Sequence, residues 1–368
     1  MSMRCKTTRE QILPSVTHAE RSVGKNPTLP VLSCVLLEVS GNILSCSATD
    51  LEVGIRSTLP VSECVDGKVA VPGTVLAQVL AALPQGAQVT LRTEGTHLLV
   101  ESATGTARVA TQDADDFPML PIAEGGVEIT LPQKALIDTL SSVAHCASTS
   151  SIKPELASVY VLAQNGVLTA VATDSFRLAE KKSALKSPVT ADAFLVPARS
   201  VHDLLRVLEP SEEQVTLKIG EHQLSLEANG IFLTLRLTAG TFPDYTQIIP
   251  KEFSVEATML VADFERVLKK ASIFSDRFKQ MTITLDHEQN CLEVHTENSS
   301  VGDTTDRVPA TFAGDPVTIS FNQRYVQDAF GPIASDSFVF AFTDSSHPAV
   351  IRAVGDDSYR YLVMPMNR

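Results

Sequence analysis

Residues 154–174 read PELASVYVLAQNGVLTAVATD, and residues 30–50 read PVLSCVLLEVSGNILSCSATD. The two stretches align at an offset of 124, since both begin with Pro and end with Ala-Thr-Asp. Each has two apolar segments around a turn that contains Gly and Asn, which predicts a β-hairpin. A fainter version, FKQMTITLDHEQNCLEVHTEN, follows at residues 278–298. Three copies of one unit are therefore predicted.

A second set of markers recurs at a spacing of 125 residues. Each hairpin is followed by a dipeptide that precedes a short helical pattern: Val71-Pro72, Val196-Pro197 and Phe321-Asn322. Three further dipeptides close the copies: Phe117-Pro118, Phe242-Pro243 and Met364-Pro365. The predicted domains are residues 1–125, 126–250 and 251–368.

Each copy is predicted to contain two helices and several antiparallel strands. The first helices are expected at residues 7–23, 133–147 and 261–274, where apolar residues recur at helical spacing. Alternating segments such as 215–219 and 223–227 predict strands. Helices with one apolar face need the sheet as their core, so the fold class is α+β, with helices packed on antiparallel sheet.

Composition excludes several classes of protein. The 368 residues are 44% hydrophobic and 20% charged, which is typical of globular domains. No apolar run reaches the roughly 20 residues that a membrane helix needs, and no secretory signal is visible, so a cytoplasmic protein without membrane contact is expected. The six cysteines form no CxxC pair, which argues against disulfides and zinc. We expect no metal site and no cofactor.

The net charge of −13 is distributed unevenly. Six helical windows hold 12 basic and 9 acidic residues, whereas the remainder holds 18 basic and 34 acidic residues. Solvated helix faces would explain this partition. A basic helix-lined surface that faces a polyanion, with acidic strands that repel non-specific nucleic acid, would explain it as well.

Catalytic signatures are mostly absent. The chain contains no GxxxxGK[ST], GxGxxG, HExxH or GxSxG motif. Ser150 to Lys153 and Ser183 to Lys186 match SxxK without the companion motifs of a serine hydrolase. Asp50 and Asp174 occupy equivalent positions, where the third copy has Asn298, which favours a turn-capping role over paired catalytic carboxylates. We predict no catalytic residues.

The motifs ATDSFRLA (172–179) and YLVMPM (361–366) resemble the bacterial sliding clamp family, the beta subunits of the replicative DNA polymerase. FPDY (242–245) and PTLPVL (27–32) strengthen the resemblance, which covers the whole chain. It implies a DNA clamp fold: a head-to-tail homodimeric ring of six similar domains, with helices around duplex DNA and sheets outside.

The resemblance also implies a cleft for partner peptides between the second and third copies. The implied binding residues are Leu156, Thr173, Ser175, Phe176, Arg177, Leu178, Pro243, Gln247, Ile248, Pro348, Leu362, Val363, Met364, Pro365 and Met366. Their Leu, Ile, Val, Pro and Met side chains suit Leu or Phe anchors. Phe176 stands where the family commonly has His, and Gln247 where it often has Arg, which makes the rim less polar.

Two further sets follow from charge and resemblance. The expected DNA-facing residues are Arg9, Arg21, Lys25, Lys134, Lys153, Arg199, Arg206, Arg266, Lys269, Lys270 and Arg277. Ile273 and Phe274 match apolar positions of the family's dimer interface, and Ala107 is the small residue expected opposite them.

The predicted function is a non-enzymatic processivity clamp. Its partners would be duplex DNA bound without sequence preference, the replicative polymerase, other proteins with clamp-binding motifs, a second copy, and a separate ATP-driven loader, because the chain has no nucleotide motif. The alternatives are a hydrolase that uses the SxxK serines or repeated aspartates, and a peptide-binding repeat scaffold without DNA.

Overall fold

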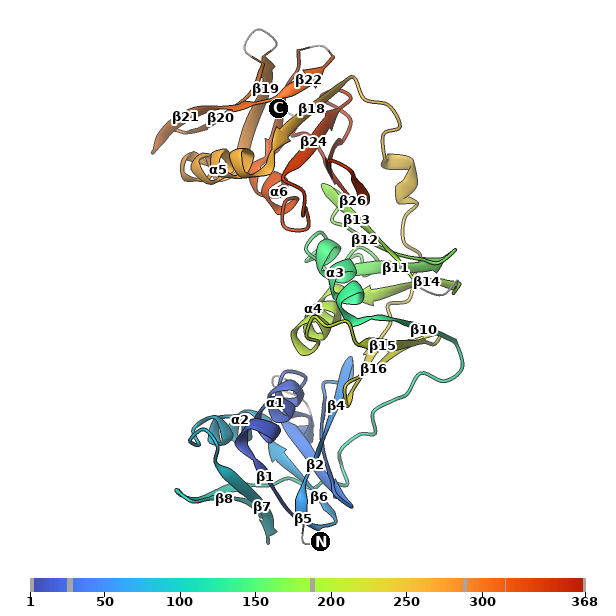
Figure 1. The fold of residues 1–368 in the computed structure, drawn as a ribbon, viewed down its shortest axis with the longest axis vertical. Helices are drawn as coiled ribbons and strands as arrows, with labels where there is room; N and C mark the ends of the chain where they lie inside the picture. Colours follow the sequence, from blue (N-terminus) through green and yellow to red (C-terminus); the bar gives the residue numbers. More distant parts are fainter. Residues whose placement is uncertain (1–2, 25–28, 186–188, 287–289, 315, 367–368) are drawn as a thin grey trace. The chain divides into compact units, whose positions relative to one another are not determined.

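The computed structural model describes residues 3–24, 29–185, 189–286, 290–314 and 316–366. The chain divides into two compact units (Figure 1). Unit 1 comprises Met1–Lys134 and Arg199–Leu237, and unit 2 comprises Ala135–Ala198 and Thr238–Arg368. Each unit is described by itself below.

Unit 1 contains two antiparallel sheets. The five-stranded sheet has the spatial order β5 (Ser62–Val65), β1 (Arg4–Thr8), β7 (Gln88–Glu94), β8 (His97–Ser102) and β9 (Gly105–Ala110). The eight-stranded sheet has the order β10 (Val127–Pro132), β15 (Gln214–Ile219), β16 (Gln223–Ala228), β17 (Ile231–Arg236), β4 (Val53–Pro60), β3 (Ile43–Thr49), β2 (Cys34–Ser40) and β6 (Gly67–Pro72). Strand β17 pairs with β4, so the second sheet joins strands of the first two copies.

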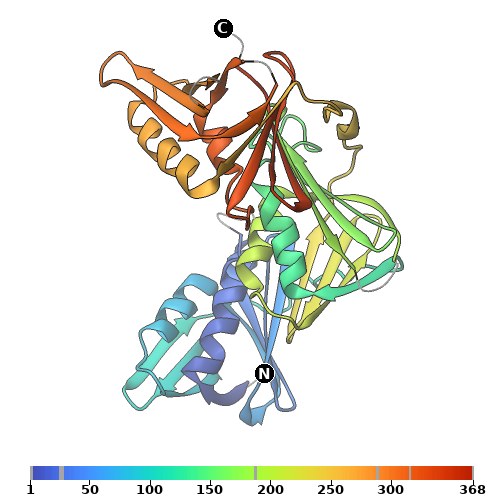
Figure 2. The same ribbon diagram turned by 45° about the horizontal axis from the view of Figure 1, so that its top comes forward.

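The helical segments of unit 1 are α1 (Arg9–Glu20), η1 (Pro30–Ser33), α2 (Gly73–Ala81) and α4 (Ala198–Val207), whose first residue belongs to unit 2. Helix α1 contacts α2, β3 and β4, and α2 contacts β6, so the pair of helices covers one face of the eight-stranded sheet (Figure 2). Its buried residues Ile12, Val16 and Ala19 recur at helical spacing, which explains the packing face.

Unit 2 repeats this design. Its nine-stranded sheet has the order β14 (Ala191–Pro197), β11 (Ser158–Gln164), β12 (Val167–Thr173), β13 (Arg177–Ala184), β26 (Asp356–Val363), β25 (Ala349–Ala353), β24 (Ser337–Phe342), β18 (Val255–Leu260) and β22 (Thr311–Ala313). Its four-stranded sheet has the order β21 (Gly302–Pro309), β20 (Cys291–Asn298), β19 (Gln280–Asp286) and β23 (Thr318–Asn322). Strand β13 pairs with β26, which joins the second copy to the third.

The helical segments of unit 2 are α3 (Gln133–Ala144), whose first two residues belong to unit 1, η2 (Tyr245–Ile248), α5 (Val261–Ala271), η3 (Ser272–Phe274) and α6 (Gln323–Asp328). The α+β prediction and the three hairpins are confirmed, since β2–β3, β11–β12 and β19–β20 lie inside the repeated stretches. The six cysteines are free, and all except Cys64 are buried.

Candidate functional site

The central motif of the second copy forms a tight turn between β12 and β13. Ser175 adopts the left-handed conformation, with φ of 78°. The Asp174 carboxylate accepts hydrogen bonds from the backbone N–H groups of Phe176 and Arg177 at 2.9 and 3.1 Å. The Thr173 hydroxyl accepts from Ser175 N and donates to the Arg177 carbonyl. These bonds fix the turn and direct the Phe176 side chain toward solvent, where it is 60% exposed.

The equivalent turns of the other copies use the same device. Asp50 accepts from Glu52 N and Val53 N, and Asn298 accepts from Ser300 N. An amide can replace the carboxylate because only an acceptor is needed. The predicted turn-capping role of the repeated aspartates is therefore confirmed.

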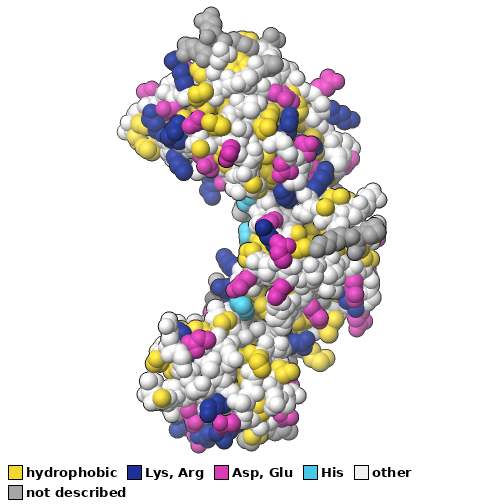
Figure 3. All heavy atoms as spheres, viewed as in Figure 1, with side chains coloured by type: hydrophobic (Ala, Val, Ile, Leu, Met, Phe, Trp, Pro, Cys, Tyr) yellow, Lys and Arg dark blue, Asp and Glu magenta, His cyan; other side chains and the backbone are white. Residues whose placement is uncertain are grey.

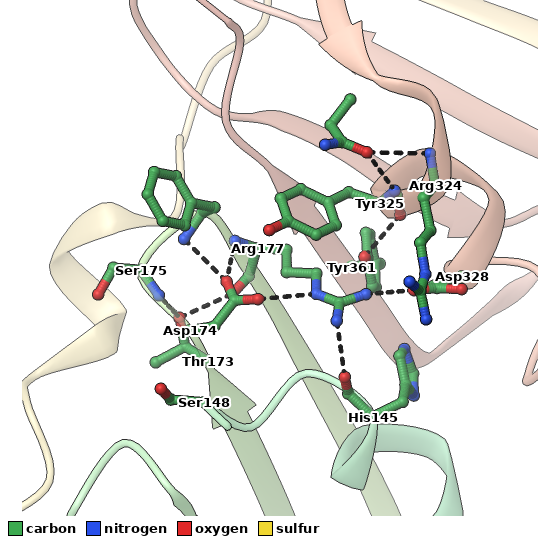
Figure 4. Close-up of polar contacts among 12 residues, drawn as sticks. His145, Ser148, Thr173, Asp174, Ser175, Arg177, Arg324, Tyr325, Asp328 and Tyr361 are labelled. Atoms are coloured by element: carbon green, nitrogen blue, oxygen red, sulfur yellow. Dashed lines mark hydrogen bonds and ion pairs between the residues drawn. The ribbon is translucent and has the colours of Figure 1, made fainter. Parts of the chain in front are cut away.

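Arg177 links the turn to the third copy (Figure 4). Its guanidinium donates to Asp174 at 3.0 Å, to the His145 carbonyl at 2.9 Å and to Asp328, and it lies 4.6 Å from the centre of the Tyr325 ring. The side chain is only 12% exposed. Two carboxylates, a carbonyl and an aromatic face thus hold one largely buried cation, a geometry that suits the planar donors of Arg.

His145 and Tyr361 lie beside this ion-pair network. The His145 ring stacks on Tyr361, with ring centres 6.1 Å apart. Burial, with a further contribution from Arg177, lowers the pKa of His145, and burial raises the pKa of the neighbouring Cys146. Both groups are therefore neutral near pH 7, so neither adds a charge to the network.

A cleft of about 620 Å³ lies beside the turn. Its floor is formed by the buried residues Leu178 and Leu362, which belong to the apolar cluster around the β13–β26 pair. Its rim carries Phe176, Ile248 and Met364, whose apolar side chains are exposed. The backbone N–H of Met364 donates to the Phe176 carbonyl at 2.8 Å, which fixes the C-terminal segment as one wall.

Most of the expected binding residues line this cleft. These are Thr173, Ser175, Phe176, Arg177, Leu178, Gln247, Ile248, Pro348, Leu362 and Met364. Five expected residues are not among the lining residues: Leu156, Pro243, Val363, Pro365 and Met366. The sequence reasoning missed six lining residues, which are Ile249, Pro250, Lys251, Glu252, Thr343 and His347. All six belong to connecting segments, where no periodic pattern marks them.

The cleft can bind apolar side chains. The Phe176 ring stacks on Tyr325 with ring centres 6.4 Å apart, so the rim presents an aromatic surface where a His would be polar. Burial of a partner's Leu or Phe side chain contributes about 1.5–3 kcal/mol. Two such anchors would give a short peptide useful affinity.

The expected DNA-facing residues differ in how available their charges are. Lys134, Lys153, Lys269 and Arg277 are exposed, and Figure 3 shows Lys and Arg side chains gathered over α5. Four others are exposed but pair with carboxylates: Arg199 with Asp50, Arg206 with Asp203, Arg266 with Asp263 and Lys270 with Asp306. Arg21 is exposed and donates to the Arg206 carbonyl.

Two members of this set stand apart. The Arg9 side chain is largely buried and contacts Glu10 and the Ala81 carbonyl. Lys25 lies outside the described residues.

The expected interface residues lie on or beside two sheet edges. Ala107 is in β9, the edge strand of the five-stranded sheet. Ile273 is 64% exposed in η3, and the Phe274 ring lies beside Gly302 of β21, the edge strand of the four-stranded sheet.

Two further expectations concern sites of other kinds. Within the described ranges, no cluster of His, Cys, Asp or Glu could hold a metal ion, and no helix is long and apolar enough to span a bilayer. Ser150 is exposed, and Lys186 lies outside the described part of the chain.

The chain has three α+β copies, and an apolar cleft lies beside the nine-stranded sheet that joins the second copy to the third. These features define a clamp-type binding protein. Models of the DNA polymerase III beta subunit match the chain along its length: the N-terminal domain at residues 1–121, the central domain at 130–244 and the C-terminal domain at 246–367. The chain belongs to the beta sliding clamp family of bacteria.

Individual relatives agree over their full lengths. The beta sliding clamp of Vibrio cholerae is 27% identical over 366 residues, covering 99% of this chain and 100% of the relative, and that of Synechococcus elongatus is 29% identical over 376 residues, covering 100% and 99%. The solved Pseudomonas aeruginosa clamp bound to griselimycin has a TM-score of 0.95 at 25% identity, and the Thermotoga maritima beta subunit 0.93 at 25%. Both alignments cover 100% of each chain.

Proposed function

We propose that this chain is a DNA sliding clamp subunit that closes with a second copy into a ring around duplex DNA. The ring would tether the replicative polymerase and dock other motif-bearing proteins through the cleft. One observation carries the proposal: each junction between copies is a shared antiparallel sheet, and the equivalent strands β9 and β21 are edge strands that pair on one side only among the described residues.

The repeat assigns equivalent strands to two groups of three. Strands β4, β13 and β21 each follow the hairpin of their copy, and β9, β17 and β26 each end a later hairpin. Within unit 1, β4 pairs with β17, and within unit 2, β13 pairs with β26. The remaining pair, β21 with β9, would form between two chains, and two such identical contacts close a dimer.

Both junctions inside the chain support one register for this contact. At their centres, Ile55 lies opposite Leu233 and Ala179 lies opposite Tyr361. By equivalence, Thr304 of one chain would lie opposite the partner's Ala107, and Asp303 would lie opposite the partner's Arg108; Thr304 and Ala107 are in the strands β21 and β9. Ile273 and Phe274 would lie beside this contact.

The charge distribution supports retention by encirclement. Several basic side chains of the helices already pair with carboxylates, so few are free to contact phosphates, and binding through few phosphate contacts is weak at physiological salt. A separate ATP-driven loader would open the ring.

The test is retention on DNA of different topology. After loading, the protein should stay on a closed circle during gel filtration and leave the same DNA once it is cut at one site. Equal retention on circular and linear DNA would contradict encirclement and favour ordinary charge-driven binding.

A further inference from the structure

We propose that a second groove beside the cleft binds an acidic stretch that flanks the anchor residues of a partner peptide. The inference rests on the proposed docking function and names the chemistry of the partner. This basic groove has a volume of about 610 Å³ and shares Ile249, Pro250 and Lys251 with the cleft, so one peptide can pass from one to the other.

The groove is positive in a strongly acidic protein. Its ionisable lining comprises Lys182, Lys251, Arg352 and Arg360 against Glu180 and Asp357, a net charge of +2 where the whole chain has −13. Glu256 pairs with Arg352 at the rim at 3.2 Å, but it is not a lining residue. Among the described residues, Lys251 forms no ion pair.

Glu180 organises the cations rather than cancelling them. Its side chain is buried at 4% exposure, and its carboxylate lies 3.1 Å from Lys182 Nζ and 3.9 Å from Arg360. One buried carboxylate thus fixes two cationic groups whose side chains remain 44% and 35% exposed. The Lys182 and Arg360 side chains are therefore already positioned for an incoming carboxylate, so they lose less conformational entropy when it binds.

The Tyr245 wall of the groove is anchored. The Tyr245 hydroxyl donates to Glu180 at 2.8 Å, and its ring packs edge-on against Phe242 and Tyr160. Burial, with the nearby Glu180 charge, raises the pKa of Tyr245, so the hydroxyl remains a donor across the physiological range. Tyr245 and Phe253 also give the groove apolar surface for the side chains between acidic residues.

The occupant is an extended acidic peptide segment because the shared wall makes the groove continuous with a cleft that fits peptide anchors. Three peptides test this by fluorescence anisotropy at 50 and 300 mM NaCl. All three contain Gln-x-x-Leu-Phe. The first has Ser on both sides of this motif, the second has four acidic residues on its N-terminal side, and the third has four acidic residues on its C-terminal side. One acidic peptide should bind about three- to tenfold more tightly than the Ser-flanked peptide at low salt, as two or three exposed ion pairs would give, and much of this gain should be lost at high salt.

Matched variants test whether the groove residues cause the tighter binding of the acidic peptide. Lys182→Ser with Arg352→Ser should remove the acidic preference and leave binding of the Ser-flanked peptide unchanged. Lys218→Ser with Arg236→Ser is the control, because it removes the same charge from strands of unit 1, and Arg236 pairs with Glu52 as Arg352 pairs with Glu256. Arg352→Ser alone, which leaves the Glu180 contacts intact, should reduce the preference if the double variant misfolds.

The outcomes separate the groove from the cleft. The groove proposal is wrong if the unmodified protein shows no preference for an acidic peptide. It is also wrong if the control variant loses that preference to the same extent as the groove variant. If the acidic peptide binds and the Ser-flanked peptide does not, the groove still binds acidic segments, and the proposal that the cleft binds the Leu and Phe anchors is wrong. If duplex DNA competes away only the acidic gain, the groove binds nucleic acid, and the peptide proposal is wrong.

Discussion

Arg177 shows how one residue can serve both structure and site. Its guanidinium joins Asp174 of the turn to Asp328 of the third copy, while Arg177 itself lines the cleft. Sequence reasoning placed Arg177 in the site through a family motif. It could not predict the contact with Asp328, because that residue lies 151 positions away and no local pattern connects the two.

The buried His145 gives a pH prediction at the same scale. Its folded-state pKa is lowered, so as pH falls the unfolded chain takes up a proton first, and stability is lost below the ordinary pKa of about 6.5. Urea unfolding at pH 7.5 and 5.5 should show a larger loss of unfolding free energy for the unmodified protein than for His145→Gln, with a ceiling of about 1.4 kcal/mol set by protonation of the unfolded chain.

Burial also lowers the pKa of His18 in unit 1. His18 is present in both proteins, so it contributes equally to the pH-dependent loss of stability in each. Equal losses in the two proteins would contradict the assignment to His145.

Elements were predictable where they follow local periodicity. Helices expected at residues 133–147 and 261–274 are observed as Gln133–Ala144 and Val261–Ala271, and the second ends in the tighter turn Ser272–Phe274. The pairings β4 with β17 and β13 with β26 were not predicted, because contacts between distant strands leave no periodic mark in either strand. The cleft residues Ile249 to Glu252 were missed because they lie in a connecting segment, which has no periodic pattern.

The C-terminal segment carries a prediction at this scale. Ending the chain after Val363 removes the Met364 wall of the cleft and its bond to the Phe176 carbonyl, while β26 remains complete. Affinity for a Gln-x-x-Leu-Phe peptide should fall at least tenfold in a calorimetric titration, and the solution mass should still be that of a dimer. Undiminished affinity would remove Met364 from the site.

At the scale of the whole molecule, the proposed inter-chain contact would be the weakest of the three equivalent junctions. Its central pair would be Thr304 with the partner's Ala107, where the junctions within the chain have Ile55 with Leu233 and Ala179 with Tyr361. Less apolar area would be buried there, and the adjacent Asp303 and Arg108 would add a salt-sensitive attraction. We therefore expect the ring to open more readily at high salt.

The register itself is testable by cross-linking. In a protein with Ala107→Cys and Thr304→Cys, mild oxidation should join two chains at both contacts, because directly opposed residues of antiparallel strands lie within disulfide reach. Non-reducing electrophoresis should show a species of twice the 39.6 kDa chain mass. Either cysteine alone is the control.

Adding Ile273→Ala and Phe274→Ala to the double-cysteine protein should lower the cross-linked fraction. A dimer that persists in sedimentation, yet never cross-links, would show that the chains meet in another register.

The boundary between the two compact units falls inside the second copy. Residues 135–198 of the second copy belong to unit 2, and residues 199–237 belong to unit 1, so the middle repeat is shared between them. A gene fragment that encodes residues 126–250 alone would leave β17 without β4 and β13 without β26, with both strand edges open to solvent. The three repeats are thus packed as two compact units, so deletion of a single repeat should expose strand edges and cause misfolding, and it would not isolate the function of that repeat.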